Sequence, residues 1–362
     1  MKQLPMDFQE QVIYSLRTLY NGSGYAQYKM SKFEEYDLYA RNKDFLISDG
    51  VITFMNTNGK LMALKPDVTL SIIKNTPESD ELRKLYYTEN VYRVARGSGS
   101  FRELAQVGLE CLGKLDDYAI AEVLTLAAES LRCISDESIL DISHLGIVAA
   151  LIDVLGVPGN CRDAFLKCIG EKNSHELSAL CRSCGIAEDR IAVLRDLLTL
   201  NGMPAFVLPR VRRLLGGLIG TACVDQLERV TEVLRENGCG EMLRIDFSSV
   251  DDMHYYNGIV FKGFVRSLPD SVLAGGQYDK LMHKMGHHNG AIGFAVYMDE
   301  LERMNREQRD YDVDVLLLYR EEDPPSAVAA ARRAIHSGGE SVLVQRSIPD
   351  NIRYKRLCEV SK

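Results

Sequence analysis

The sequence has no apolar run long enough to cross a membrane. The longest apolar runs, such as Val313–Tyr319, are far shorter than the roughly 20 apolar residues that a membrane-spanning helix needs. The first residues, from Met1 to Asp7, lack the apolar core of a secretory signal peptide. We therefore expect a cytoplasmic protein with no membrane association.

The cysteines do not form a disulfide framework. The chain has nine of them, and an odd number without framework spacing is typical of reduced thiols in a reducing compartment. Cys161, Cys168, Cys181 and Cys184 offer four thiols to a zinc ion, but the stretches around them have a helical pattern and no Cys-x-x-Cys pair is repeated. We expect buried helix cysteines there, no metal and no cofactor.

Positive charge is in short supply. The chain has 43 lysines and arginines against 51 aspartates and glutamates, for a formal net charge of −8. Lys and Arg carry phosphate binding, so this balance does not favour a nucleic-acid protein, although it leaves a local basic face open. Hydrophobic residues make up 46% of the 362 residues, which is ample for the cores of two or three domains.

Hydrophobic periodicity and turn residues predict the order of the elements. In the first part, helices are expected at Asp7–Asn21 and Asp67–Lys74, with a hairpin at Ile52–Leu64 between them. Two long strands are expected at Leu85–Tyr92 and Phe101–Leu112. Hairpins joined by short loops indicate an antiparallel sheet. The pattern is helical from about Ser143 to Glu236 before strands return, and helices are expected again at Gln277–Met285 and from near Ala295.

The helical block has the size of a small domain and interrupts the sheet. It is an insertion, because strands resume after it. After Arg309 the pattern is strand–helix–strand, which predicts a small α/β unit. We expect a core in two parts, residues 1–142 and 241–308. The helical insertion is expected at residues 143–240 and the C-terminal unit at residues 309–362.

One predicted strand, Phe101–Leu112, carries polar side chains on a single face. Side chains alternate along a strand, so Arg102, Gln106 and Glu110 share a face on which Gly108 has no side chain. The glycine would leave a slot of about 7 Å between an amide and a carboxylate. Such a slot suits a small ligand with hydrogen-bond donors, such as an imidazole N–H. The alternative is a solvated outer face with a glycine at a bend of the sheet.

Three further segments can contribute to such a site, although each also has a simpler explanation. Asp67 and Thr69 stand at a predicted helix start, where an acidic residue also complements the helix dipole. Tyr255 and Tyr256 precede a glycine turn, where aromatic rings also pack on sheet edges. The last segment is a strand–glycine–glycine–helix junction that includes Tyr278, where the backbone can approach a ligand.

The order of these motifs resembles that of the catalytic core of class II histidyl-tRNA synthetases. From Leu4 to Leu301 the chain contains a hairpin, Lys-Pro-Asp-x-Thr, Tyr-Arg, Gln-x-Gly-x-Glu, a helical insertion, Tyr-Tyr-Asn-Gly and Gly-Gly-x-Tyr-Asp. The family has Arg-Pro-Glu-Gly-Thr, Phe-Arg-x-Glu, Gln-x-Gly-x-Glu, Arg-Gly-Leu-Asp-Tyr-Tyr and Gly-Gly-Arg-Tyr-Asp in the same order. The resemblance implies an α+β fold, with an antiparallel sheet flanked by helices, a helical insertion and a small C-terminal α/β unit.

The resemblance also implies that the family's histidine pocket is retained. Asp67 stands where a glutamate holds the α-ammonium group of the amino acid, and Thr69 supports it. Gln106 and Glu110 match the polar strand face of the pocket, and the tyrosines match those around the imidazole. The implied histidine-binding residues are Asp67, Thr69, Gln106, Glu110, Tyr255, Tyr256 and Tyr278.

The departures from the family fall on the groups that bind ATP. The motif-2 arginine survives as Arg93, with Arg102 as a second vestige, but its partner glutamate is replaced by Ala95. Three further arginines of the family fall on Asp251, Gln277 and Glu300. Loss of one such donor typically costs about 2.7–4 kcal/mol in the transition state. The resemblance therefore implies negligible adenylation of the amino acid.

A synthetase-like core that binds histidine without activating it is similar to one known family, the regulatory subunit of ATP phosphoribosyltransferase. In that family a homodimer assembles with a short catalytic subunit into a hetero-oligomer that condenses ATP with phosphoribosyl pyrophosphate and is inhibited by histidine. The resemblance implies a non-catalytic subunit in histidine biosynthesis, with histidine as ligand and the catalytic subunit as partner. Only about half of the synthetase anticodon module follows Asp310, so tRNA is not an expected partner.

Two other functions are compatible with the same sequence. An active histidyl-tRNA synthetase would need Arg96, Arg102 or Arg303 to replace the missing arginines. A synthetase-like paralogue would bind another amino acid or serve another partner. An aminoacylation assay separates the synthetase from the regulatory subunit, and a co-purifying phosphoribosyltransferase separates the regulatory subunit from the paralogue.

Overall fold

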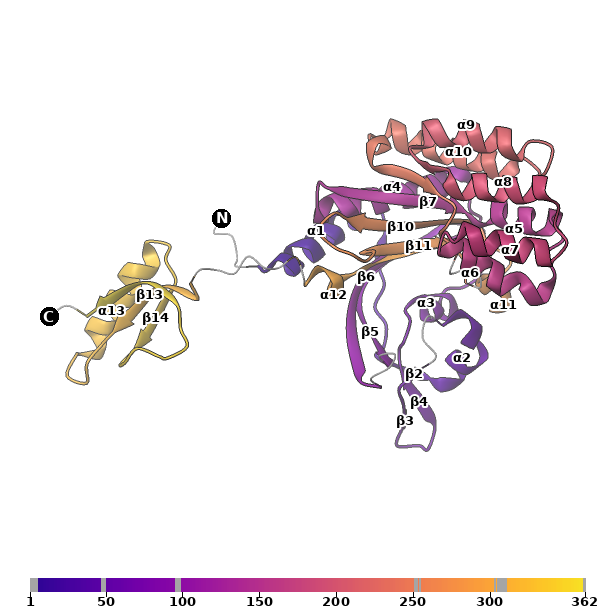
Figure 1. Ribbon diagram of the computed structural model, residues 1–362. Coiled ribbons are helices and arrows are strands. Elements are labelled where there is room, and N and C mark those ends of the chain that lie inside the picture. Colours follow the sequence, from indigo (N-terminus) through magenta and orange to yellow (C-terminus); the bar gives the residue numbers. More distant parts are fainter. Residues whose placement is uncertain are drawn as a thin grey trace. The chain divides into compact units, whose positions relative to one another are not determined.

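The computed structural model of the chain describes residues 6–46, 50–94, 99–250, 253, 255–302, 304 and 311–360. Four positions singled out in the sequence, Ala95, Arg96, Asp251 and Arg303, lie outside the described residues. The chain forms two compact units, Met1–Arg303 and Met304–Lys362. The smaller unit is the yellow part of Figure 1.

A nine-stranded sheet is the centre of the larger unit (Figure 1). Its strands lie in the order β1 (Ala26–Gln27), β5 (Arg83–Val94), β6 (Phe101–Gly113), β12 (Gly290–Tyr297), β11 (Leu273–Gln277), β10 (Ile259–Val265), β7 (Ser138–His144), β9 (Leu243–Asp246) and β8 (Asn201–Gly202). Neighbouring strands are antiparallel except for the parallel pairs β1–β5 and β7–β9. The predicted antiparallel sheet is therefore confirmed, with the long hairpin β5–β6 near one edge.

The amphipathic helix α4 (Asp117–Ile134) contacts β7, β10 and β12 and so covers one face of this sheet. The helix α1 (Phe8–Gly22) packs against α4. The Asp116 carboxylate caps α4 by accepting a hydrogen bond from the Ala119 N–H at 2.8 Å. Such a cap satisfies a backbone donor that the first helical turn leaves free. The sequence-predicted first helix is confirmed as α1.

The strand register separates the two faces of the sheet. Leu131 of α4 lies where a side chain at Gly263 of β10 would be. Gly263 stands opposite Leu273 of β11, which stands opposite Val296 of β12, which in turn stands opposite Val107 of β6. These four residues therefore share one face of the sheet. Because side chains alternate along a strand, odd-numbered side chains of β6 face α4 and even-numbered ones face the opposite side.

A run of helices lies between β7 and β9, at the upper right of Figure 1. They are α5 (Leu145–Val154), η2 (Gly159–Cys161), α6 (Arg162–Gly170), α7 (Ser174–Ser183), α8 (Glu188–Thr199), α9 (Pro204–Leu215), α10 (Ala222–Glu236) and η3 (Gly240–Met242). The helical pattern predicted from Ser143 to Glu236 is confirmed, apart from the end of β7 and the short edge strand β8. The domain boundaries expected at residues 142 and 240 stay a prediction.

A second sheet in the larger unit has three strands. Its order is β2 (Phe33–Glu35), β4 (Leu61–Leu64) and β3 (Thr53–Met55). The β3–β4 hairpin turns at Asn56, whose side-chain oxygen accepts hydrogen bonds from the Asn58 and Lys60 N–H groups at 2.9 Å each. This turn confirms the predicted hairpin. The short helix α2 (Tyr36–Arg41), which is followed by η1 (Lys43–Phe45), contacts β2 and β4.

Two predicted helices begin later than expected. The helix α3 (Thr69–Asn75) begins after Asp67, with Val68 at the N-cap, and the Asp67 carboxylate accepts a hydrogen bond from the Leu70 N–H of its first turn at 2.9 Å. The helix α11 (Asp279–Lys284) begins after Gln277, which ends β11. Both differences place site residues at the entry to a helix rather than within it.

The helix predicted to begin near Ala295 begins three residues later and is short. Gly290–Tyr297 forms the strand β12, and the short helix α12 (Met298–Leu301) begins after it. β12 lies between β6 and β11, and most of its residues are buried. A strand that is covered on both faces does not alternate polar and apolar residues, and a short apolar run then does not distinguish a strand from a helix.

The C-terminal unit is a small α/β structure. It consists of β13 (Val313–Leu318), α13 (Pro325–Ser337), β14 (Val342–Gln345) and β15 (Tyr354–Glu359), with the parallel strand order β14–β13–β15. The predicted strand–helix–strand is confirmed, whereas the largely polar β15 is not predicted from the sequence. The predicted α+β class is confirmed. No helix in the described part of the chain is both long and apolar enough to span a membrane.

Candidate ligand-binding site

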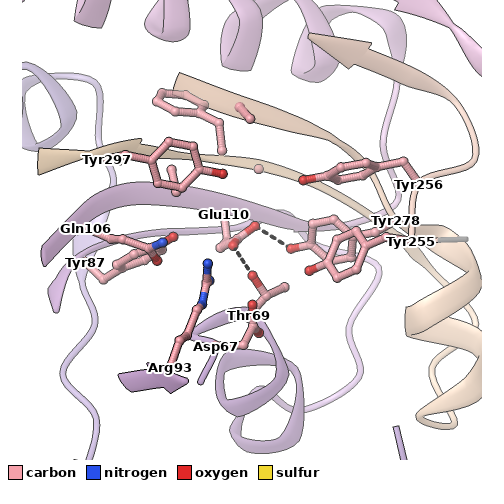
Figure 2. Close-up of a pocket in the computed structure, with 14 residues that line it drawn as sticks. Asp67, Thr69, Tyr87, Arg93, Gln106, Glu110, Tyr255, Tyr256, Tyr278 and Tyr297 are labelled. Carbon is pink, nitrogen blue, oxygen red and sulfur yellow. Dashed lines mark hydrogen bonds between the residues drawn. The ribbon is translucent and has the colours of Figure 1, made fainter. Parts of the chain in front are cut away.

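The polar strand face predicted from the sequence is buried. Gln106 is 5% exposed and Glu110 is 2% exposed, and both lie on the sheet face opposite α4. Together with residues of β5 and β12 and of the chain around the starts of α3 and α11, they line a cavity (Figure 2). The alternative of a solvated outer face is therefore wrong.

The slot expected above Gly108 is filled. The β5–β6 register places Tyr87 opposite Gly108, and the Tyr87 hydroxyl oxygen lies 2.5 Å from the position that a Gly108 Cβ would take. The Phe294 carbonyl oxygen lies 2.4 Å from the same point. This position therefore requires glycine because of the close approach of neighbouring strands, and Tyr87 forms part of the cavity wall. Sequence reasoning missed Tyr87 because one strand alone does not define its register.

Glu110 lies at the centre of the site (Figure 2). Its Oε1 accepts a hydrogen bond from Thr69 Oγ1 at 2.8 Å, and its Oε2 accepts one from the Tyr278 hydroxyl at 2.5 Å. Burial raises the pKa of Glu110 to about 8, although these two hydrogen bonds oppose the shift. The carboxyl group is therefore largely protonated at pH 7. The neighbouring strand leaves room for it, since a Cβ at Gly293 would overlap Oε2.

Asp67 supplies a second buried carboxyl group to the cavity. Burial raises its pKa, an effect that the hydrogen bond from the Leu70 N–H and the nearby Arg93 guanidinium oppose. Arg93 also lines the cavity, and its Nε donates a hydrogen bond to the Pro66 carbonyl oxygen at 3.1 Å. The site thus combines two carboxyl groups with a guanidinium group, which are complementary to a small ligand that carries charges of both signs.

Tyrosines form the wall of the cavity beside Glu110 (Figure 2). The ring centroids of Tyr255 and Tyr256 lie 4.6 Å apart, and those of Tyr255 and Tyr278 lie 5.9 Å apart. Burial raises the pKa values of Tyr255 and Tyr278 well above the ordinary value, so both hydroxyls stay protonated and can donate hydrogen bonds. Tyr297 of β12, opposite Gln106, is a further lining residue. It was missed because β12 was predicted to be helical from Ala295.

The cavity has little free space. Its volume is about 40 Å³, and one water molecule needs roughly 10–15 Å³. The free space therefore accommodates a few water molecules. The structure brings together the residues expected to bind histidine, namely Asp67, Thr69, Gln106, Glu110, Tyr255, Tyr256 and Tyr278. Their role as ligand contacts stays a prediction.

The described positions at which the resemblance places phosphate-binding arginines, Gln277 and Glu300, do not line the cavity. Gln277 is buried, and its Oε1 accepts a hydrogen bond from the Ile259 N–H at 2.7 Å. Glu300 lies on α12. Arg102, the second vestigial arginine, has a largely exposed side chain. Of the two vestigial arginines, the cavity therefore retains Arg93.

The nine cysteines are free thiols. The expectation of buried helix cysteines is confirmed for Cys168 in α6 and Cys181 in α7. It is wrong for Cys161 and Cys184, which are partly exposed because they lie at helix ends. Within the described ranges, no group of three or more His, Cys, Asp or Glu side chains is placed to hold a metal ion.

Comparison with known proteins gives a consistent result. The sequence profile of the Histidyl-tRNA synthetase family matches residues 4–301. The ATP phosphoribosyltransferase regulatory subunit of Oceanobacillus iheyensis is 26% identical over 350 residues, which cover 94% of this chain and 86% of that protein.

Solved structures share the fold. An ATP phosphoribosyltransferase regulatory subunit/histidyl-tRNA synthetase from Bacillus halodurans has a TM-score of 0.79 at 24% identity, covering 97% of this chain and 93% of its own. A chain of the ATP phosphoribosyltransferase (HisG:HisZ) complex from Thermotoga maritima has a TM-score of 0.64 at 20% identity, covering 82% of this chain and 98% of its own. These matches confirm the predicted synthetase-like fold.

Proposed function

This chain belongs to the histidyl-tRNA synthetase family, and we propose that it is a non-catalytic, histidine-binding regulatory subunit of an ATP phosphoribosyltransferase. Such a subunit serves the activity and the feedback control of the first step of histidine biosynthesis. One contrast carries the proposal. Groups suited to an amino acid line a buried cavity, whereas Gln277 and Glu300 stand where the resemblance places phosphate-binding arginines.

The cavity offers a partner for each polar group of histidine. The Asp67 carboxylate suits the α-ammonium group, the Arg93 guanidinium suits the α-carboxylate, and Glu110 suits an imidazole nitrogen. In its protonated form Glu110 donates to an unprotonated ring nitrogen, and in its ionised form it accepts from a ring N–H. The surrounding tyrosines enclose the ring with aromatic surface and hydroxyl groups.

Activation of the bound amino acid is not expected. Adenylation needs positive groups around the α-phosphate where charge develops. The Gln277 amide oxygen accepts a hydrogen bond from the strand backbone and the side chain brings no charge, while Glu300 carries a carboxylate. One missing donor typically costs about 2.7–4 kcal/mol in the transition state. The phosphoribosyl chemistry would therefore belong to a partner chain.

We propose a short ATP phosphoribosyltransferase catalytic subunit as that partner, with a homodimer of this chain inside a hetero-oligomer. Two similarities support this choice. The Oceanobacillus iheyensis relative is an ATP phosphoribosyltransferase regulatory subunit, and the Thermotoga maritima structure is an ATP phosphoribosyltransferase complex of two kinds of chain, HisG and HisZ. The free state of the cysteines supports the reducing cytoplasm as its compartment. The net charge of −8 argues against tRNA as a partner.

Feedback control requires histidine to distinguish two states of the assembly. By linkage, histidine inhibits only if it binds the inhibited assembly more tightly than the active one. The small free volume of the cavity supports such a difference, because histidine binding would be sensitive to any rearrangement of the lining side chains. A rearrangement of this kind can change the surface that the catalytic subunit contacts.

Calorimetric titration of the purified chain with histidine, combined with an ATP–pyrophosphate exchange assay, tests the proposal. We expect saturable histidine binding, no comparable binding of other amino acids, and no histidine-dependent exchange. Exchange at a rate typical of synthetases would indicate an active histidyl-tRNA synthetase instead. Preference for a different amino acid would indicate a paralogue with another function.

A further inference from the structure

We infer that Lys65 is a positioning residue that fixes the ligand-binding carboxylate of Asp67, an inference that rests on the proposed binding of histidine. Lys65 does not line the cavity, so it would act through the segment that follows it. Its exposed fraction is 0%, although lysine is among the residue types least often buried. This burial calls for a physical explanation.

An ion pair with Glu89 holds the lysine in place. Lys65 Nζ lies 2.5 Å from Glu89 Oε2, and the two side chains are 1% and 16% exposed. A buried ammonium group without a partner would be strongly destabilising, so the lysine is confined to this contact. Glu89 stands directly opposite Gln106 in the β5–β6 register. The ion pair therefore anchors the lysine to the part of the sheet that carries the site.

The main chain of the same segment is also tied to β5. The Tyr92 N–H donates a hydrogen bond to the Lys65 carbonyl oxygen at 2.9 Å. Arg93 Nε donates to the Pro66 carbonyl oxygen at 3.1 Å. The Lys65 N–H also donates a hydrogen bond to the Lys32 carbonyl oxygen at 3.1 Å. Four links thus fix residues 65 and 66 immediately before Asp67, and the Lys65 side chain supplies the buried ion pair among them.

Accurate placement matters at Asp67 because its side chain is short. A carboxylate has to lie at hydrogen-bond distance from a ligand ammonium group, and an aspartate has one methylene less than a glutamate with which to reach it. In enzymes, a displacement of about 1 Å can cost roughly a hundredfold in rate, and a hydrogen bond to a ligand likewise requires a narrow range of distances. Loss of the Lys65–Glu89 pair would loosen the segment on which Asp67 stands without removing any cavity-lining side chain.

The experiment measures histidine affinity and urea unfolding for Lys65→Met, Glu89→Gln and the double variant Lys65→Met/Glu89→Gln. The double variant leaves no unpaired buried charge, so it is expected to fold even if a single variant does not. We expect each folded variant to bind histidine at least about tenfold more weakly than the parent. The matched control Lys60→Met/Glu35→Gln removes an exposed ion pair of the small sheet and should leave the affinity unchanged.

Two results would overturn the inference, and they are distinguishable. A folded double variant that binds histidine as tightly as the parent would show that the ion pair serves stability alone. A parent protein that binds no histidine would contradict the proposed function, and the inference with it. In the first case the parent protein still binds histidine, and in the second case it does not. One series of titrations therefore separates the two results.

Discussion

The environment of the Glu110 side chain is typical of a ligand site. A carboxyl group buried in a protein is destabilising unless it is hydrogen-bonded or neutral. Glu110 receives hydrogen bonds from Thr69 and Tyr278, and burial raises its pKa to about 8. Titratable groups with strongly shifted pKa values inside cavities are typical of functional sites. The group can change its protonation state when a charged ligand arrives.

Glu110→Gln should weaken histidine binding by about tenfold to a hundredfold. When histidine binding ionises Glu110, the carboxylate accepts a charge-assisted hydrogen bond from the imidazole ring, which contributes about 1.5–3 kcal/mol, and about 1.4 kcal/mol corresponds to a factor of ten. The amide keeps the size of the side chain, so the fold should be retained, which circular dichroism checks. Calorimetry measures the affinity. Unchanged affinity in the folded variant would remove the main residue on which the histidine-binding proposal stands.

The same variant isolates a pH dependence of stability. The pKa of Glu110 is raised from 4.5 to about 8 in the folded chain, so between these values the folded state holds a proton that the unfolded state has lost. The free energy of unfolding therefore falls as the pH rises through this window, by at most about 1.4 kcal/mol per pH unit for one proton.

Urea unfolding between pH values of about 5 and 8.5 should show a smaller fall for Glu110→Gln than for the parent. Asp67 and Asp141 also have raised pKa values, but they are present in both proteins and largely cancel in the comparison. Equal falls in the two proteins would contradict a buried, protonated carboxyl group at position 110.

At the scale of elements, the site depends on how closely β12 passes β6. A Cβ at Gly293 would overlap Glu110 Oε2. Gly293→Ala should therefore push the carboxyl group away from Thr69 and Tyr278. We expect a loss of about 1–3 kcal/mol in the free energy of unfolding and histidine binding at least about tenfold weaker.

Urea unfolding and calorimetry measure the two effects of Gly293→Ala. The matched control is Gly159→Ala in the helical insertion, where a methyl group would meet no atom within 4 Å; this control should change neither quantity. Affinity in Gly293→Ala equal to that of the parent would argue against a ligand that contacts Glu110.

Helices and strands with a clear local pattern could be predicted from the sequence, whereas those that depend on contacts between strands could not. The helix α1 and the hairpin β5–β6 follow from local periodicity and turn residues. The strand β12 does not, because a strand covered on both faces has no alternation. Tyr87 is missed for a related reason, since its place above Gly108 depends on cross-strand register. The order of motifs brings the cavity residues together, but only the fold shows that Thr69 and Tyr278 both donate to Glu110.

At the scale of the whole molecule, the proposal requires assembly. The small sheet exposes the large apolar side chains of Phe33, Phe54, Met55 and Leu61, and the rings of Phe33 and Phe54 lie 5.3 Å apart. An exposed apolar patch is typical of a contact surface. Light scattering at micromolar concentration should show a homodimer, and a larger complex after a short catalytic subunit is added. A strict monomer that does not associate with the subunit would count against a regulatory role.

A regulatory, non-catalytic chain should control the rate at which a short catalytic subunit transfers the phosphoribosyl group to ATP. The rate is measured with and without this chain, over a range of histidine concentrations. We expect transfer to depend on the chain and to fall as histidine is added, with a half-inhibiting concentration about tenfold or more higher in the complex with Glu110→Gln. A rate that is independent of the chain, or a complex that does not respond to histidine, would contradict the claim.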